Sequence, residues 1–262
     1  MRFSILIPII KGKFLPIAIE SILKQSFSDW ELILYNDCSW DDIEKITDKY
    51  RSNKVKYFKG KKNLGAKDPS RTWNKILTLA KGDYVCLLGD DDFLSENYLE
   101  EVGKLVLRYP EIVLFRTRLK RVNEKNEIIF TGSTLPEHET WDQMMYQRNK
   151  KNRVQSTCEF ILKRDKLLEV GGYPSFPRAC GSDDAVCLLM AEKDGIVSTN
   201  KTFGFWRKSS LNISDNDSEK INKQKMKFYL KWEKDFLDRI LSFKIPAHLL
   251  YESIEKKLNN DI

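Results

Sequence analysis

Apolar runs alternate with segments of helical periodicity through the first 115 residues. Short runs rich in apolar residues predict strands, because strands buried on both faces of a parallel sheet are apolar almost throughout. Apolar residues that recur every three to four positions predict helices instead. Strands are expected at 3–8, 30–35, 55–58, 83–88 and 112–115, and helices at 15–25, 39–50, 70–81 and 96–108. This alternation predicts an α/β fold with a single Rossmann-like, mostly parallel sheet flanked by helices.

The pattern after residue 115 is less regular. It predicts a hairpin around residues 123–126, helices at 141–148, 164–170 and 183–193, a strand at 157–163 and an extended segment at 203–208. A polar break at 215–218 precedes two basic amphipathic helices, at 219–241 and 247–258. We therefore expect one domain at 1–214 and a helical tail at 215–262. The tail either packs on the domain, which is the preferred interpretation, pairs with another chain or lies on an anionic membrane.

Three consecutive acids, Asp90, Asp91 and Asp92, directly follow the predicted buried strand at 83–88. Adjacent carboxylates at a strand end repel one another and lose solvation, so the arrangement is costly without a cation. Mg²⁺ and Mn²⁺ prefer such oxygen ligands, often one or two carboxylates together with substrate phosphates. The run predicts a metal–diphosphate site at the carboxyl edge of the sheet, where ligands of open α/β sheets bind. The alternative is a solvated acidic turn in which Asp92 or Ser95 caps the next helix.

Composition narrows the chemistry further. The net charge of +7 admits nucleic acid, an anionic membrane or phosphorylated ligands as partners. The basic clusters do not interleave with aromatic residues and no nucleic-acid motif is present, so nucleic acid is not expected. With two histidines in the chain, acid–base work is expected to fall to carboxylates.

Location is predicted from the first residues and the cysteines. Met1 and Arg2 lead directly into the first strand, which predicts no signal peptide. Five cysteines without a CxxC pair predict reduced thiols. We expect a cytoplasmic protein, with the tail as a candidate for peripheral contact with the inner face of the cell membrane.

The ordered set of motifs resembles the inverting, nucleotide-sugar-dependent glycosyltransferases of family 2, which have the glycosyltransferase A fold. The resemblance spans residues 3–214. It rests on Ser4-Ile5-Leu6-Ile7-Pro8, the segment 19–33, Asn36-Asp37-Cys38-Ser39, Asn63-Leu64-Gly65, Asn74 before residues 80–84, the acid triplet, Gly171-Gly172-Tyr173 and Ser182-Asp183-Asp184. It implies a nucleotide-binding half at 1–115 and an acceptor-binding half at 116–214.

The resemblance also implies roles on the donor side. Asp37 would accept a hydrogen bond from the nucleobase, and Asp90 would bind the ribose. Asp91, with Asp92 as the alternative, would hold a metal ion that bridges the two phosphates. Further donor-binding positions are expected at Pro8, Ile9, Arg71, Asn74 and Arg207, with Lys208 and Ser214 near the last. Trp206 is either a core residue or a platform for an acceptor sugar.

The general base is expected at Asp184, with Asp183 as the alternative. An inverting transfer is a single displacement, so a carboxylate must remove the acceptor hydroxyl proton on the face opposite the leaving nucleotide. Without the family context, Ser182, Asp183 and Asp184 would be interpreted as caps of the following helix.

The family implies transfer from a nucleoside-diphosphate sugar, UDP-sugar by default, to a hydroxyl of a glycan or lipid-linked glycan in surface polysaccharide assembly. The usual Pro-Thr-Tyr-Asn after the first strand is Pro8-Ile9-Ile10-Lys11 here, and the usual Asp-Asp pair is Asn36-Asp37, which leaves the nucleobase open. One rival is a catalytically idle glycan-binding or scaffold member of the fold. Another is a sugar-phosphate nucleotidyltransferase, which would need a Gly-rich loop where residues 8–13 hold one glycine.

Overall fold

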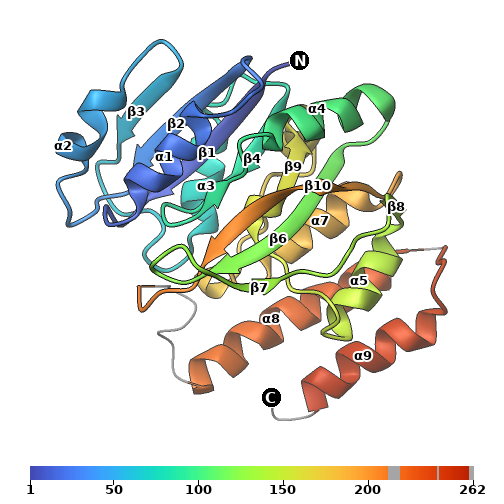
Figure 1. Ribbon diagram of the computed structural model, residues 1–262. Helices are drawn as coiled ribbons and strands as arrows, with labels where there is room; N and C mark the ends of the chain where they lie inside the picture. Colours follow the sequence, from blue (N-terminus) through green and yellow to red (C-terminus); the bar gives the residue numbers. More distant parts are fainter. Residues whose placement is uncertain (212–218, 241, 260–262) are drawn as a thin grey trace.

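The computed structural model describes residues 1–211, 219–240 and 242–259, without the side chains of 219–222 and 259. A mixed ten-stranded sheet forms the centre of this part of the chain. Ser214 and the predicted boundary after it lie outside these residues. The strands are β1 (Phe3–Ile9), β2 (Trp30–Asn36), β3 (Val55–Lys59), β4 (Tyr84–Leu87), β5 (Phe93–Leu94), β6 (Leu114–Val122), β7 (Ile128–Thr131), β8 (His138–Glu139), β9 (Phe160–Lys163) and β10 (Ile196–Arg207). Their order is β3-β2-β1-β4-β9-β6-β10-β5, with β7 beside β6 and β8 beside β10. The predicted α/β class is confirmed (Figure 1).

Parallel pairing links β3, β2, β1 and β4, and it also links β6 to β10. β9 breaks the parallel run, because it pairs antiparallel with β4 on one side and with β6 on the other. The hairpin predicted around residues 123–126 is present between β6 and β7. Because β1, β2 and β4 run in one direction, the loops after all three strands meet at the same edge of the sheet.

Helices cover both faces of the sheet. They are α1 (Leu15–Leu23), α2 (Ile43–Thr47), α3 (Ser70–Leu77), α4 (Tyr98–Arg108), α5 (Trp141–Asn149), α6 (Arg164–Glu169), α7 (Ser182–Ala191), α8 (Glu219–Leu237) and α9 (Ala247–Asn259), with 3-10 turns at Asp48–Tyr50, Thr157–Glu159 and Pro177–Ala179. Alternate residues of β1 divide between the two layers: Ile5 and Ile7 pack with α1 and α4, whereas Leu6 packs with α3 and α7. This division explains why β1 is apolar at every position except Ser4, whose buried hydroxyl donates to Glu31.

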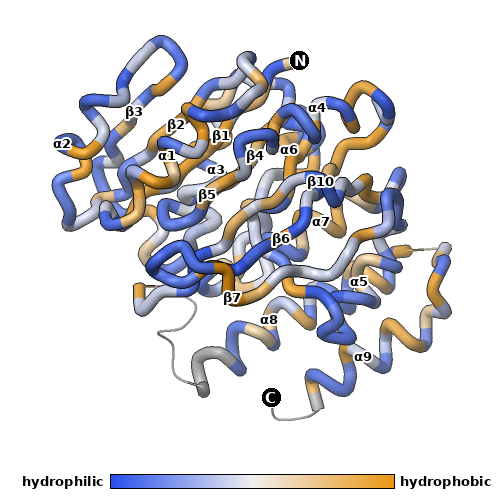
Figure 2. The backbone as a smooth tube through the Cα atoms, viewed as in Figure 1, coloured by the Kyte–Doolittle hydropathy of each residue, from blue (hydrophilic) through white to orange (hydrophobic). Residues whose placement is uncertain are grey.

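The C-terminal helices pack on the domain, as their amphipathic pattern predicts. Leu230, Phe236, Leu250 and Ile254 belong to the same buried cluster as α3, α5 and α7. Figure 2 shows apolar and polar positions alternating along α8 and α9, which is the pattern of a helix with one buried face. Within the described ranges, none of the helices has the length and apolar character needed to cross a bilayer.

Two local predictions are corrected. Helix α2 begins after Asp42, whose carboxylate accepts the Lys45 N–H, and not at Ser39. The Ser39 hydroxyl instead donates to the carbonyl of Ile10, which ties the loop after β2 to the loop after β1. The predicted extended segment at 203–208 is the second half of β10, which begins at Ile196 and runs to Arg207.

Candidate active site

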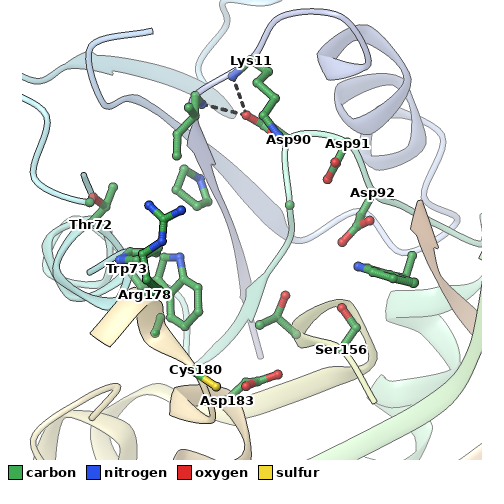
Figure 3. A pocket seen from close by; sticks show the side chains of 18 of the residues that line it. Lys11, Thr72, Trp73, Asp90, Asp91, Asp92, Ser156, Arg178, Cys180 and Asp183 are labelled. Atoms are coloured by element: carbon green, nitrogen blue, oxygen red, sulfur yellow. Dashed lines mark hydrogen bonds between the residues drawn. The ribbon is translucent and has the colours of Figure 1, made fainter. Parts of the chain in front are cut away.

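A cavity of about 360 Å³ opens at the carboxyl edge of the sheet, where β1 and β4 end. Figure 3 shows its walls: Lys11 and the three acids on one side, Trp73 and Arg178 on another, and Cys180 and Asp183 at the base of α7. The lining comes from segments far apart in sequence: Pro8, Ile10, Lys11, Gly65, Pro69, Thr72, Trp73, Gly89, Asp90, Asp91, Asp92, Ser156, Thr157, Arg178, Ala179, Cys180, Gly181, Asp183, Trp206 and Lys225. The loops after β1 and β4 line the cavity, whereas the loop after β2 does not line it and is joined to the loop after β1 by the Ser39–Ile10 hydrogen bond. Ile9, a predicted donor-binding residue, is buried beneath this surface, while its neighbours Pro8 and Ile10 line it.

Asp90 joins the end of β4 to the end of β1. Its carboxylate accepts the backbone N–H groups of Ile10 and Lys11, both at 2.7 Å. Burial raises the pKa of Asp90 to about 7, and the charge of Asp91 adds to the rise, while the two N–H donors oppose it. Asp90 therefore fixes the shape of the loop after β1 at the edge of the cavity.

Asp92 is held by the last residue of β10. The backbone N–H of Arg207 donates to the Asp92 carboxylate at 2.9 Å, and the Arg207 guanidinium donates to the carbonyl of Asp91 at 2.8 Å. The same guanidinium reaches Asn123 and Asn126 in the β6–β7 hairpin, so it is buried and does not line the cavity. Arg207, predicted to contact the donor, thus supports the turn formed by Asp90, Asp91 and Asp92 (the acid turn) without lining the cavity.

The ionised forms of the carboxylates in the acid turn are disfavoured by burial and by mutual repulsion, and a bound cation would stabilise them. Burial raises the pKa of Asp92 well above its usual value, and the charges of Asp91 and Asp90 add to the effect. Burial also raises the pKa of Asp91, against the opposing charges of Lys11 and Arg207. Gly89 permits the tight turn, since a Cβ there would lie 2.9 Å from an Asp92 oxygen.

These carboxylates fit a divalent ion that takes only part of its coordination from the protein. In the described residues, no group of three or more His, Cys, Asp and Glu side chains is arranged to hold a metal. Asp91 and Asp92 both line the cavity, and two carboxylates completed by phosphate oxygens is a common arrangement for Mg²⁺. The donor set fits Mg²⁺ or Mn²⁺ bound together with a phosphorylated substrate.

Asp37 lies beneath the cavity wall and not on its surface. Its fully buried carboxylate accepts the N–H groups of Leu64 and Gly65, both at 2.8 Å, and the Thr72 hydroxyl at 2.6 Å. Gly65 and Thr72 in turn line the cavity. Asp37 therefore shapes this wall, and its predicted contact with a nucleobase stays a prediction.

Helix α3 presents other residues to the cavity than the predicted Arg71 and Asn74. Arg71 is exposed, and Asn74 exchanges two 2.8 Å hydrogen bonds with the backbone of Tyr173. Thr72 and Trp73 line the cavity instead. The sequence placed the helix near the site but did not fix which of its faces turns inward.

Asp183 and Asp184 lie in the first turn of α7 and face different surroundings. Arg148 binds Asp184 through two hydrogen bonds of 3.0 and 3.1 Å, and Gln155 donates to the same carboxylate. Asp183 lines the cavity (Figure 3), and burial raises its pKa to about 7, with the charge of Asp184 adding to the rise and Arg148 opposing it. The geometry favours Asp183, the alternative of the sequence prediction, as the group that can exchange a proton with a ligand.

Sequence reasoning gave no role to Arg178 and Lys225, two further cations of the cavity lining. Arg178 has a left-handed backbone with φ of 60°, and its N–H donates to the carbonyl of Lys67 at 2.9 Å. Residues forced into this region by their surroundings often lie at functional sites. No sequence signal marks such a residue, because the conformation depends on contacts made across the fold.

Comparison with known proteins defines the class. Residues 4–171 match the sequence profile described as "Glycosyl transferase family 2", and the chain belongs to this family. It is therefore a glycosyltransferase.

Two relatives and one solved structure show what the chain is similar to. The glycosyltransferase GlyG of Streptococcus pneumoniae is 26% identical over 258 residues, which cover 94% of this chain and 80% of GlyG. The poly(ribitol-phosphate) β-N-acetylglucosaminyltransferase TarS of Staphylococcus aureus is 27% identical over 126 residues, which cover 47% of this chain but 22% of TarS. A crystal structure of TarS residues 1–349 in complex with UDP-GlcNAc superposes with a TM-score of 0.70 at 18% identity, over 99% of this chain and 72% of that one.

Proposed function

We propose that the protein is an inverting glycosyltransferase of the glycosyltransferase A fold that uses a nucleoside-diphosphate sugar, by default a UDP-sugar. The acceptor would be a hydroxyl of a glycan or lipid-linked glycan in surface polysaccharide assembly. One observation carries the proposal: a single cavity has three acids on one wall and the carboxylate of Asp183 on another. The TarS structure with UDP-GlcNAc supports the donor class, because the fold neighbour holds a nucleotide sugar.

The donor would lie across the ends of β1 and β4. One wall of the cavity would flank the nucleoside; it is formed by Gly65, Pro69, Thr72 and Trp73. Asp37 holds this wall in place through its hydrogen bonds to Gly65 and Thr72. Asp91 and Asp92 would hold Mg²⁺ or Mn²⁺, which supplies charge neutralisation for the departing diphosphate. Lys11, which also lines the cavity, would supply a further positive charge on that side.

Asp183 would act as the general base. In a single displacement the acceptor oxygen attacks the anomeric carbon as the bond to the diphosphate oxygen breaks, and the hydroxyl proton passes to the base. A base with a pKa of about 7 is ionised in roughly half of the molecules at neutral pH and still accepts a proton effectively. Arg148 would hold Asp184 and so fix the first turn of α7, from which Asp183 projects.

A calorimetric titration of UDP, GDP, CDP and dTDP, each with and without Mn²⁺, tests the donor site. We expect one nucleotide to bind in a metal-dependent manner, and we expect the Asp91→Asn variant to lose at least tenfold in affinity. The matched control is Asp83→Asn, an exposed acid at the opposite end of β4, which should bind like the wild type. If no nucleotide binds with Mn²⁺ present, the transferase proposal fails and the idle scaffold member becomes the better interpretation.

A further inference from the structure

A second cavity, of about 710 Å³, lies behind the base of α7. Its walls come from the end of α5, the start of α7 and the two C-terminal helices α8 and α9. Cys180, Gly181 and Asp183 line both this cavity and the one beside the acid turn. Asp183 therefore stands at the junction, with the three acids on one side and the second cavity on the other.

The second cavity is lined by five cations: Arg148, Lys150, Lys151, Lys256 and Lys257. Asp183 and Asp184 are the only carboxylates among the described residues that line it, which leaves an excess of three positive charges. Arg148 is taken up by Asp184, and Lys257 donates to the side chain of Asn149 at 2.5 Å. Within the described ranges, no carboxylate forms an ion pair with Lys150, Lys151 or Lys256.

Burial and neighbouring cations disfavour the charged form of Lys257. Burial lowers the pKa of Lys257, and the positive charges of Arg148 and Lys151 lower it further, against the opposing effect of Glu233. A helix dipole favours a cation near each C-terminal end, yet the end of α5 with the two residues after it and the last turn of α9 together bring five cations to one cavity. The excess charge is therefore available to a ligand of opposite sign.

We propose that this cavity is the acceptor subsite and that it recognises a phosphate group carried by the glycan acceptor. The inference rests on the proposed function and names the class of its second substrate. In an inverting transfer the acceptor must approach from the side opposite the diphosphate, and the second cavity lies on that side of Asp183. A phosphate offers acceptor oxygens to several lysines at once, which explains why both the segment after α5 and the last turn of α9 contribute lysines.

The test measures binding of glycerol 1-phosphate by ligand-observed NMR, with glycerol as the neutral control. Saturating UDP and Mn²⁺ fill the donor site first, so that a phosphate cannot bind there. The variant Lys151→Gln/Lys256→Gln changes two exposed side chains without an ion pair, so its fold should be unaffected. The matched control is Lys231→Gln/Lys234→Gln, which removes the same charge from exposed positions of α8 that do not line the cavity.

We expect the wild type to bind glycerol 1-phosphate and not glycerol. The Lys151/Lys256 variant should bind it at least tenfold more weakly, whereas the Lys231/Lys234 variant should lose less than twofold. Equal losses in both variants, or no binding by the wild type, would overturn the proposal. UDP binding should be the same in all three proteins, so a failure of the donor site is recognised separately.

A membrane headgroup is the competing source of phosphate. Sedimentation with phosphatidylglycerol vesicles distinguishes it from a glycan phosphate. Binding of glycerol 1-phosphate without binding to vesicles supports the acceptor subsite. Vesicle binding that depends on Lys151 and Lys256 would assign the cavity to a lipid surface and overturn the proposal.

Discussion

Replacing Asp183 and Asp184 one at a time should change stability in opposite directions and should lower turnover to very different extents. The two residues are adjacent, yet one faces the cavity and the other is bound by Arg148. We consider Asp183→Asn and Asp184→Asn, which keep the side-chain volume and remove one negative charge each. Asp183→Asn removes the proposed base, and Asp184→Asn removes the partner of a guanidinium.

The size of each effect follows from the surroundings. A pKa of about 7 for Asp183, against the usual 3.8, corresponds to roughly 4 kcal/mol of unfavourable free energy for the ionised form in the folded protein. Because the Asp183 side chain is partly open to the cavity, we expect Asp183→Asn to raise the free energy of unfolding by about 2 kcal/mol at pH 8. Asp184→Asn should lower the free energy of unfolding by about 2 kcal/mol. This is less than the loss expected for breaking a fully buried ion pair, because a third of the Arg148 side chain is exposed.

Turnover should fall more in Asp183→Asn, the more stable of the two variants, than in Asp184→Asn. Loss of a general base lowers kcat by about 10²–10⁴-fold, so Asp183→Asn should be the more stable and far less active variant. The kcat of Asp184→Asn should fall roughly tenfold, because the first turn of α7 that positions Asp183 would be held less firmly. Nucleotide release from the sugar donor at pH 8 and thermal unfolding measure the two properties. A folded Asp184→Asn protein that loses all turnover while Asp183→Asn keeps it would refute the reasoning and restore Asp184 as the base.

Three further predictions follow from the same structure. Turnover should rise with pH through about 7 as Asp183 loses its proton, and in Asp184→Asn the rise should move to lower pH because a like charge is gone; an unchanged pH profile would contradict this. Asp37→Ala should lower the free energy of unfolding by about 3 kcal/mol, because two backbone N–H groups and a hydroxyl lose their acceptor, and calorimetry should show weaker nucleotide binding; wild-type urea unfolding would argue against it. Gly181→Ala should cost about 2–3 kcal/mol, since its φ is +82° and a Cβ would lie 2.4 Å from the Tyr229 ring, whereas Gly171→Ala, with open space at a similar φ, should cost less in thermal unfolding.

The sequence predicted the elements whose signal is local. Strands β1, β2 and β4 were recognisable from apolar runs, and the acid turn from its position after β4. The antiparallel insertion of β9 between β4 and β6 was not, because strand–helix alternation carries no information on which strands become neighbours. The pairing of Arg148 with Asp184 joins positions 36 residues apart, so the sequence could not separate the roles of the two adjacent acids.

Arg207 sets a limit on how this enzyme can be recombined with its relatives. Its side chain ties the turn of Asp91 and Asp92 to Asn123 and Asn126 at the tip of the β6–β7 hairpin. A chimera cut at residue 115 would separate the acid turn from the two segments that brace it. The exchangeable unit on the donor side is therefore the first 115 residues together with the hairpin and the end of β10, although these parts are distant along the chain.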